Sequence, residues 1–420
     1  MRMELMDRIT GRVNGERMAA DLGALAEMTR RDQPGYTRLA YSEEDRQARV
    51  WLRQRMEAAD LMVRLDAAAN VIGRRPGESE GAVLVVGSHM DTVPNGGRFD
   101  GIAGLVAGLE IARVFHEVGR RLRHPLEVIA FTNEEPNAFG ISTVGSRAMA
   151  GKLTAARARE LRDPGGGTLA EAIDFLGGDA VHLDEARRPR GAIACYLELH
   201  IEQGPVLDRE RIQVGVVTGI AAPTRLRVHV GGRADHAGTT PMGMRQDALA
   251  GAAEIVLALE SIATDVGDSV GTTGRLVNQP NHANVVPGDV EMTVEFRSIL
   301  PERIGLVRAR LLEAMQEIAR RRGLTVSWEF TMEERPLQIP PEIVERATAV
   351  CQELGIPFRK LPSGASHDAN HIAEIAPVAM LFVPSVSGRS HCPEEFTDIT
   401  DIAAGTRALL GLLLRLDALN

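Results

Sequence analysis

The sequence predicts an α/β protein in which a mostly parallel sheet forms one domain and a smaller α+β domain is inserted into it. Short apolar runs that end in acidic or histidine side chains flank a segment of helical periodicity, as strand–helix–strand units require. Residues from about 217 to 332 instead contain runs in which apolar and polar side chains alternate. The 420 residues exceed what one hydrophobic core usually serves, so two domains are expected.

Four apolar runs have the composition of strands that are buried on both faces of a sheet. They are "AVLVVGSHMD" (82–91), "LEVIAFTNEE" (126–135), "AIACYLELHIEQG" (192–204) and "PVAMLFVPSVSGRSH" (377–391). Between the first two lies "GIAGLVAGLEIARVFHEVG", whose apolar residues recur at helical spacing. Because ligands of such sheets bind beyond the carboxyl ends of the strands, we expect all four polar clusters to lie there.

The stretch 217–332 predicts the order strand–helix–strand–strand–helix–strand, which is the ferredoxin-like split motif. Its second predicted helix, "ERIGLVRARLLEAMQEIARRRG", has one apolar face, formed by Ile304, Val307, Leu311, Ala314, Met315 and Ile318. The fourth polar-ended strand comes after this stretch. We therefore predict a discontinuous domain of residues 1–216 and 333–420, with residues 217–332 inserted into it.

Composition narrows the possible partners and the compartment. The net charge of −9 argues against a nucleic-acid partner or an anionic membrane, since both require a basic patch. Cys195, Cys351 and Cys392 are too few and too scattered for a disulfide framework or a thiolate zinc site. The charged N-terminus and the absence of a long apolar run argue against a secretory signal and a membrane span. A reducing cytoplasm is expected.

Each polar residue at the strand ends also has a simpler interpretation. A histidine such as His89 is more often hydrogen-bonded than metal-bound, and Asp100 could merely cap the helix that starts near Gly101. The pair Glu134-Glu135 could be a solvated acidic turn. Two adjacent carboxylates at the end of an apolar strand nevertheless repel each other unless a cation or a shared proton is present.

Taken together, the strand ends supply the ligands of two divalent ions. The predicted ligands are His89, Asp100, Glu135, His200 and His391. This set matches two ions with one bridging carboxylate and two terminal ligands each, provided that Asp100 is the bridge. Glu134 is then left free of metal to act as the general base, and Asp91 is the carboxylate expected to orient the His89 imidazole. Imidazole and carboxylate ligands without thiolate favour Zn, which Mn, Co or Ni could replace.

The chain resembles the dinuclear zinc amidohydrolases and peptidases related to aminoacylase, specifically the branch of N-carbamoyl-L-amino-acid hydrolase, β-ureidopropionase and allantoate amidohydrolase. The matching stretches are "GSHMDTVPNGGRFDGIAGLVAGLE", "NEEPNAFGISTVGSRAMAGKL", "ELHIEQGPVL", "GRADHAGTTPM", "NQPNHANVVPG" and "SGASHDA". The resemblance implies that Asp100 joins His89 and His200 on one ion and Glu135 and His391 on the other. It also implies that Glu134 is the base, and a histidine at position 200 favours the carbamoyl-hydrolase side.

The same resemblance implies roles for residues that composition alone would describe as turn or surface positions. His236 is expected to stabilise the oxyanion across a dimer interface, so that the inserted domain serves as lid and dimerisation domain of a homodimer. The expected substrate-binding residues are Gln203, Asn284, Arg297, Gly364 and Ala365. An arginine such as Arg297 can bind a substrate carboxylate with two parallel hydrogen bonds.

The resemblance predicts hydrolysis of a non-peptide C–N bond in a linear amide, a small molecule with a ureido or carbamoyl group. An N-carbamoyl-L-amino acid would give the amino acid, CO₂ and ammonia. Allantoate amidohydrolase and β-ureidopropionase are the alternatives, followed by an aminoacylase or exopeptidase. A further alternative is a metal-binding relative without catalytic activity. Glu134 argues against it, because such a protein would not need an unliganded carboxylate beside the metal. The stretches "SGASHDAN" and "PNAFG" depart from the pattern of relatives. Ser366 and Asn370, in the first stretch, bear on pocket size or polarity. The identity of the substrate therefore stays open.

Overall fold

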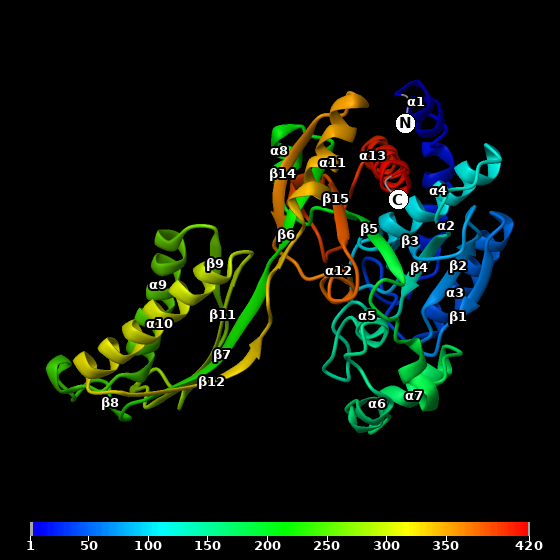
Figure 1. The fold of residues 1–420 in the computed structure, drawn as a ribbon. Coiled ribbons are helices and arrows are strands. Elements are labelled where there is room, and N and C mark those ends of the chain that lie inside the picture. Colours follow the sequence, from blue (N-terminus) through cyan, green and yellow to red (C-terminus); the bar gives the residue numbers. More distant parts are fainter. Residues whose placement is uncertain (1–2, 419–420) are drawn as a thin grey trace. The chain divides into compact units, whose positions relative to one another are not determined.

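The computed structural model describes residues 3–418, which divide into two compact units (Figure 1). The first unit extends to Thr218, includes Ile339–Leu361 and resumes at His367. The second unit consists of Gly219–Gln338 and Pro362–Ser366. Within residues 3–418, none of the helices combines the length and the apolar character that a membrane crossing requires.

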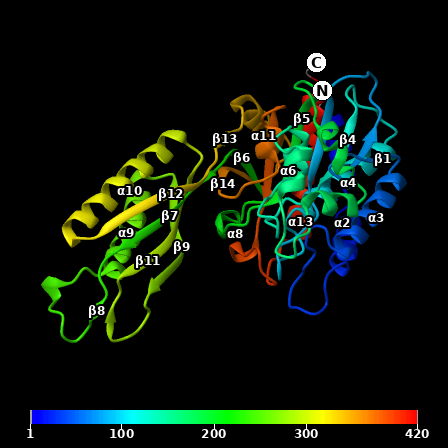
Figure 2. The same cartoon turned by 90° about the horizontal axis from the view of Figure 1, so that it is seen from below.

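The sheet of the first unit has the strand order β1-β2-β4-β3-β5-β15-β6, with β14 beside β6 (Figure 1). These strands are β1 (Met62–Leu65), β2 (Val71–Arg75), β3 (Val83–His89), β4 (Leu126–Phe131), β5 (Ile193–Ile201), β6 (Val214–Ile220), β14 (Phe358–Ser363) and β15 (Val378–Val383). Figure 2 shows strands β1, β4, β5, β6 and β14 of this sheet from below. The central strands β4, β3, β5 and β15 are parallel, and they are the four polar-ended strands that the sequence predicted. Antiparallel strands flank them on both sides, which the sequence pattern did not predict.

Helices cover this sheet and extend around it. They are α1 (Met3–Thr10), α2 (Gly15–Glu27), α3 (Glu43–Ala58), α4 (Ile102–Glu117), α5 (Val144–Met149), α6 (Ala155–Glu160), α7 (Leu169–Phe175), α8 (Val206–Glu210), α11 (Pro341–Glu353), α12 (Ala369–Ile372) and α13 (Ile399–Asp417), with short 3-10 helices at Ala180–Ala186 and Val386–Gly388. Strands β3, β4 and β15 are buried along their whole length, as expected for strands covered on both faces.

Helix α4 is the predicted helix between the first two polar-ended strands, and its residues 102–112 are all buried. It packs against β3, β4, β5 and α13. A glycine lets it approach the sheet closely: a Cβ atom at Gly104 would lie 2.3 Å from the carbonyl oxygen of Leu199 and 2.8 Å from Cβ of Ser88. This close packing fixes the start of α4, and therefore Asp100, against the ends of β3 and β5.

The second unit has the predicted ferredoxin-like order of elements. They are β7 (Ala222–Gly231), α9 (Ala248–Val266), β9 (Ser269–Gln279), β11 (Asp289–Ser298), α10 (Pro301–Arg322) and β12 (Thr325–Glu333). The strands form an antiparallel sheet in the order β12-β7-β11-β9, and both helices pack on one face of it. Val307, Leu311, Met315 and Ile318 are buried in its core, as predicted.

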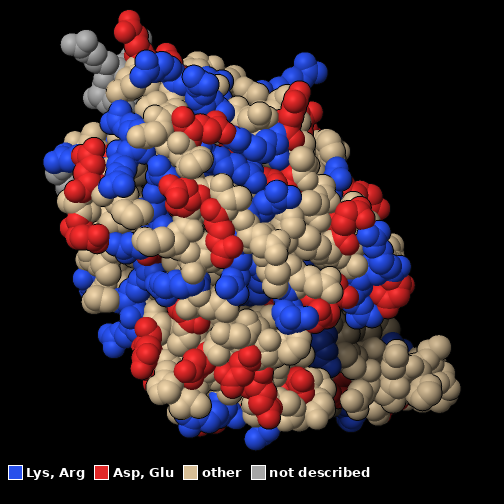
Figure 3. Space-filling view, turned by 90° about the vertical axis from the view of Figure 1, so that its right-hand side faces the viewer, with Lys and Arg blue, Asp and Glu red and all other residues tan. Residues whose placement is uncertain are grey.

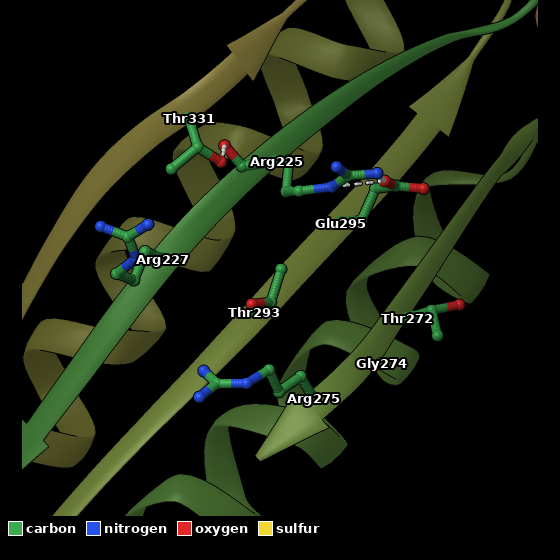
Figure 4. A pocket seen from close by; sticks show the side chains of 8 residues that line it. All are labelled: Arg225, Arg227, Thr272, Gly274, Arg275, Thr293, Glu295 and Thr331. Atoms are coloured by element: carbon green, nitrogen blue, oxygen red, sulfur yellow. Dashed lines mark hydrogen bonds and ion pairs between the residues drawn. The ribbon is translucent and has the colours of Figure 1, made fainter. Parts of the chain in front are cut away.

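Three short strands and a 3-10 helix complete the second unit. Strands β8 (Asp235–His236) and β10 (Val285–Val286) pair with each other, and β13 (Leu337–Gln338) pairs with Gly219 and Ile220 at the end of β6. Met242–Met244 forms the 3-10 helix. The sheet face without helices is polar, and Figure 4 shows Arg225, Arg227, Thr293 and Glu295 projecting from β7 and β11.

Charged side chains of both signs are interspersed on the molecular face shown in Figure 3. Neither the basic nor the acidic side chains form a large separate field on that face. This distribution agrees with a composition in which Asp and Glu only modestly outnumber Lys and Arg.

We expect Gly104→Ala to lower the apparent free energy of unfolding by about 1–3 kcal/mol or more, because the added methyl group overlaps backbone atoms that cannot move independently. Gly23→Ala in α2 is the matched control, since a Cβ there has no neighbour within 4 Å and alanine favours helix by about 0.5–1 kcal/mol. Urea unfolding of both variants checks this. Equal effects of the two substitutions would contradict the packing argument.

Candidate metal centre

The polar residues that follow the four central strands lie at one edge of the sheet. His89 is the last residue of β3, and His200 is the next-to-last residue of β5. Glu134 and Glu135 follow β4, while His391 follows β15 after a short loop. Because these strands are parallel neighbours, their carboxyl ends meet at the same edge, as the sequence predicted.

The side chains form two groups that share Asp100. In the first group, the Nε2 atoms of His200 and His89 lie 3.1 Å and 3.5 Å from Oδ1 of Asp100. In the second group, Nε2 of His391 lies 3.1 Å from Oδ2 of Asp100 and 3.3 Å from Oε1 of Glu135. The ligand atoms of each group lie within 4.8 Å of one another. The two oxygens of one carboxylate thus face two separate groups.

Hydrogen bonds fix which imidazole nitrogens point into the first group. Nδ1 of His89 donates to the carbonyl oxygen of Asp91 at 3.0 Å, and Nδ1 of His200 donates to the carbonyl oxygen of Ile201 at 2.9 Å. A carbonyl oxygen only accepts, so Nδ1 carries the proton and Nε2 of the neutral ring presents a lone pair. Although Nε2 of His200 is close to Asp100, it has no hydrogen-bond partner among the described residues. Lone pair and carboxylate therefore face each other directly.

The electrostatics of the site also require positive charge. Burial lowers the pKa of His89 and of His200, but nearby carboxylates outweigh burial and raise both pKa values above the usual imidazole value. Hydrogen bonds to Asp100 and Glu135 raise the pKa of His391 to about 11. Burial raises the pKa of Asp100, yet the three imidazoles lower it well below its usual range. The cluster therefore stabilises any positive charge that enters it.

These residues fit a divalent metal ion. Each group offers imidazole nitrogens and carboxylate oxygens, and no thiolate belongs to either. That donor set suits Zn and also other divalent transition metals. The unpartnered, buried Nε2 of His200 is the lone pair that a metal would accept.

Glu134 lies beside the two groups without belonging to either. Its Oε2 lies 3.8 Å from Nε2 of His89, and the residue is 9% exposed. Burial raises its pKa well above the usual carboxyl range, and the charges of Glu135, Asp368 and Asp91 add to this effect while His89 opposes it. The residue is therefore a carboxylate of increased basicity at the edge of the cluster.

Asp91 acts differently from the prediction. We expected its carboxylate to orient the His89 ring, but Nδ1 of His89 donates to the backbone carbonyl of Asp91, and the nearest carboxylate contact is 3.9 Å long. The carboxylate instead accepts the backbone N–H groups of Glu134 at 3.1 Å and Glu135 at 3.0 Å. Asp91 thus orients the imidazole through its main chain and positions the two glutamates through its side chain.

Gln203 lies within the cluster. Its Nε2 donates to Oδ2 of Asp100 at 2.7 Å and is 3.3 Å from Nε2 of His391. Gln203 and His391 both have positive φ, at 58° and 55°. Non-glycine residues adopt this region at an energetic cost and do so most often at functional sites.

The loop that carries Asp100 depends on a second glycine. Gly101 has φ of 69°, and a Cβ atom there would lie 2.5 Å from the His89 ring. Gly101 is the N-cap of α4 and no side chain caps this helix, so Asp100 is not the helix cap that its position also allowed. The glycine lets the imidazole of His89 pack directly against the loop.

Sequence reasoning missed Glu395, which is buried at 4% exposure. Its Oε1 accepts the N–H groups of Phe99 at 2.9 Å and Asp100 at 3.1 Å, while its Oε2 accepts the Ser390 hydroxyl at 2.9 Å. One carboxylate therefore joins the loop of Asp100 to the loop of His391. The only sequence signal is an acid four residues after His391, and many surface loops contain the same pattern.

A second buried carboxylate, Glu198, lies two residues before His200 on the same side of β5. It accepts hydrogen bonds from the hydroxyl groups of Ser88 at 2.8 Å and Tyr196 at 2.9 Å. The His367 ring packs edge-on against His200 with ring centroids 4.6 Å apart. The His367 contact restricts the His200 ring, and the apolar pattern of the strand gave no indication of it.

The remaining predicted site residues belong to the second unit. His236 pairs with Val285 between β8 and β10, and the N–H of Ala237 donates to the carbonyl oxygen of Asn284 at 2.9 Å. Nδ1 of His236 accepts the N–H groups of Gly238 at 3.1 Å and Thr239 at 3.3 Å. The neutral ring therefore carries its proton on Nε2, which makes this exposed side chain a hydrogen-bond donor.

Two hydrogen-bond acceptors fix the guanidinium group of Arg297. Its Nε donates to Oε1 of Glu295 at 2.7 Å, and its Nη1 donates to the carbonyl oxygen of Gly364 at 3.0 Å. Arg225 also binds Glu295, through the other carboxylate oxygen (Figure 4). Ala365, next to Gly364, donates its N–H to the Ser363 hydroxyl at 3.2 Å. The fixed guanidinium keeps further N–H groups for a ligand.

We expect Glu395→Ala to lower the apparent free energy of unfolding by about 2 kcal/mol or more, because two buried N–H groups lose their acceptor. Glu394→Ala is the matched control: that side chain is exposed and its ion pair with the exposed Arg389 is screened by solvent, so little change is expected. Urea unfolding measures both. If Glu395→Ala were as stable as the control, Glu395 would not be needed to join the loop of Asp100 to the loop of His391.

Known proteins resemble this chain over most of its length. The model of peptidase family M20/M25/M40 matches residues 85–415. An N-carbamoyl-L-amino-acid amidohydrolase of Paenarthrobacter aurescens is 40% identical over 408 residues, which cover 97% of this chain and 99% of the relative. An allantoate amidohydrolase of Escherichia coli K12 is 35% identical over 385 residues, covering 91% and 93%.

A solved structure agrees with the fold. The amidase of the hydantoinase/carbamoylase family from Burkholderia multivorans superimposes with a TM-score of 0.90 at 34% identity, covering 96% of this chain and 98% of that one. The family match spans most of the chain and includes every strand end described above. The chain therefore belongs to the metal-dependent peptidase family M20/M25/M40 and is a hydrolase that acts on amides.

Proposed function

We propose that the chain is a dinuclear zinc hydrolase of N-carbamoyl-L-amino acids, releasing the amino acid, CO₂ and ammonia. The observation that carries this proposal is the arrangement around Asp100, whose two oxygens face separate groups of ligand atoms while Glu134 remains outside both. These residues would hold two divalent ions, which would supply Lewis acidity, and the free carboxylate beside them would supply the base for metal-assisted amide hydrolysis.

The substrate class rests on the relatives. Two of them, from Paenarthrobacter aurescens and Geobacillus stearothermophilus, are each 40% identical and are named as amidohydrolases of N-carbamoyl-L-amino acids. A neutral carbamoyl group needs an electrophilic centre and a base at its carbonyl, and the cluster supplies the residues for both.

In the proposed reaction, two divalent ions bound by these groups would supply the Lewis acidity that polarises the carbamoyl carbonyl. Glu134 removes a proton from the attacking water and later returns it to the leaving nitrogen. Its raised pKa suits this task, since a more basic carboxylate takes a proton from water more readily. Asp91 keeps Glu134 and Glu135 in place by accepting their N–H groups.

The second unit provides the proposed substrate-binding groups. His236, with its proton on Nε2, and Asn284 would donate hydrogen bonds to the oxyanion, and Arg297 would bind the α-carboxylate. Gln203 and the backbone of Gly364 and Ala365 would complete the contacts with the substrate.

We also propose a cytoplasmic homodimer that associates through the second unit, with His236 acting in the partner's site. Strand β9 supports this assembly because it is an edge strand of its sheet and exposes Val270, Leu276 and Val277 at 61%, 38% and 40%. Leu257 on α9 is 64% exposed. Long apolar edge strands are sites of strand pairing between chains.

Allantoate hydrolysis is the second candidate. The relative from Escherichia coli K12 that is named allantoate amidohydrolase is 35% identical over 91% of this chain. The same cluster and base would serve a substrate with two ureido groups. The two candidates differ in the part of the substrate that lies away from the reacting carbonyl.

We expect Glu134→Gln to retain two ions per subunit and to lower kcat by about 10²–10⁴-fold, the contribution of a general base. The substitution removes the proton acceptor without touching either ligand group. Metal analysis by mass spectrometry and an ammonia-release assay measure the two quantities. Glu135→Gln is the matched control, expected to weaken ion binding as well as activity. Unchanged turnover in Glu134→Gln would rule out the base.

The substrate proposal is tested with a panel of N-carbamoyl-L-amino acids, allantoate, β-ureidopropionate and dipeptides, each with added Zn or Mn. We expect the highest kcat/KM for an N-carbamoyl-L-amino acid, because the two relatives named for that substrate are 40% identical, whereas the relative named for allantoate is 35% identical. Preferential hydrolysis of allantoate would select the second candidate. Hydrolysis of dipeptides alone would overturn both.

A further inference from the structure

A cavity of about 520 Å³ adjoins the metal centre within the first unit. Asp91 and Glu135 lie in its wall, so one end of the cavity is formed by the centre itself. The rest is formed by the segment 136–139, by residues 39–41, and by residues from α7 and the loop before it. A volume of this size is typical of pockets for small molecules.

The cavity walls are largely apolar and include large rings. Leu39, Phe139 and Ala172 line the cavity, together with Phe175, which is 49% exposed although it is a large aromatic side chain. Phe139 meets Tyr41 edge to face with ring centroids 5.9 Å apart. Apolar walls with a few polar groups are the usual character of a ligand pocket.

Tyr41 gives an independent indication of a ligand. Its backbone has φ of 65°, an uncommon conformation for a bulky residue, and such outliers concentrate at ligand sites. Its hydroxyl oxygen is buried and has no hydrogen-bond partner among residues 3–418. Buried polar groups are almost always paired, so this hydroxyl group is available to a polar atom of a bound molecule.

The charges in the wall restrict what the cavity can accept. The carboxylate of Asp91 is occupied by the N–H groups of Glu134 and Glu135, and that of Asp163 accepts the N–H of Gly167 at 2.9 Å. These carboxylates, with Glu135, disfavour an anionic group in the cavity. No Lys or Arg lines it among the described residues.

We infer that this cavity receives the side chain of the substrate and that the enzyme prefers N-carbamoyl-L-amino acids with large apolar side chains, aromatic ones above all. This inference rests on the proposed function, because it assumes that the carbamoyl group lies at the metal centre. It assigns side-chain selection to Leu39, Tyr41, Phe139, Ala172 and Phe175. The segment 136–139 forms part of the same wall.

Ala172→Trp tests the inference by filling the cavity. We expect it to raise KM for N-carbamoyl-L-phenylalanine at least tenfold, while KM for N-carbamoylglycine, which has no side chain, changes less than twofold. Val181→Trp is the matched control: this residue is 67% exposed and does not line the cavity, so both KM values should stay within twofold of wild type. Ala172→Leu replaces the Trp variant if circular dichroism shows that the latter is unfolded.

Calorimetric titration with L-phenylalanine and with glycine provides a second measurement that does not need turnover. We expect L-phenylalanine to bind wild type more tightly than glycine does, and Ala172→Trp to abolish that difference. Equal effects of Ala172→Trp on both substrates, or no effect on either, would overturn the side-chain pocket and leave the proposed function intact. Wild type that hydrolyses neither substrate but binds L-phenylalanine selectively would overturn the proposed function and retain the pocket.

Discussion

The shared carboxylate of Asp100 is the constraint on which the rest of the site depends. One oxygen faces His89 and His200, the other faces His391, and both are buried. Such an arrangement forces lone pairs and negative charge into one small volume, which only positive charge makes stable. Close packing of α4 through Gly104, and of the His89 ring against Gly101, holds this carboxylate where both groups can reach it.

Much of the fold could be predicted from the sequence because its signals are local. The apolar runs identified β3, β4, β5 and β15, and the periodicity of residues 301–322 identified the buried face of α10. The short strands β1 and β2 escaped prediction because each has only four or five residues and neither shows a clear apolar pattern, although the first three residues of β2 are buried.

The candidate site, like the fold, could be predicted from the sequence only in part. Residue type and position at strand ends were enough to predict that these side chains gather at one edge of the sheet, because parallel strands bring their ends together. The choice between the carboxylate and the carbonyl of Asp91 as partner of His89 depends on distances of about one ångström, which no sequence pattern contains. Glu395 and the cavity near Tyr41 arise from contacts between distant segments, so only the folded chain displays them.

The position of His391 after the second unit in the sequence has a consequence for biosynthesis. A nascent chain possesses the residues of the first ligand group as soon as β5 has left the ribosome, but the whole second unit is made before His391 and Glu395 appear. The loop of Asp100 then gains its last hydrogen bonds. Products that terminate between β5 and His391 accordingly contain the residues of the first group and cannot form the second.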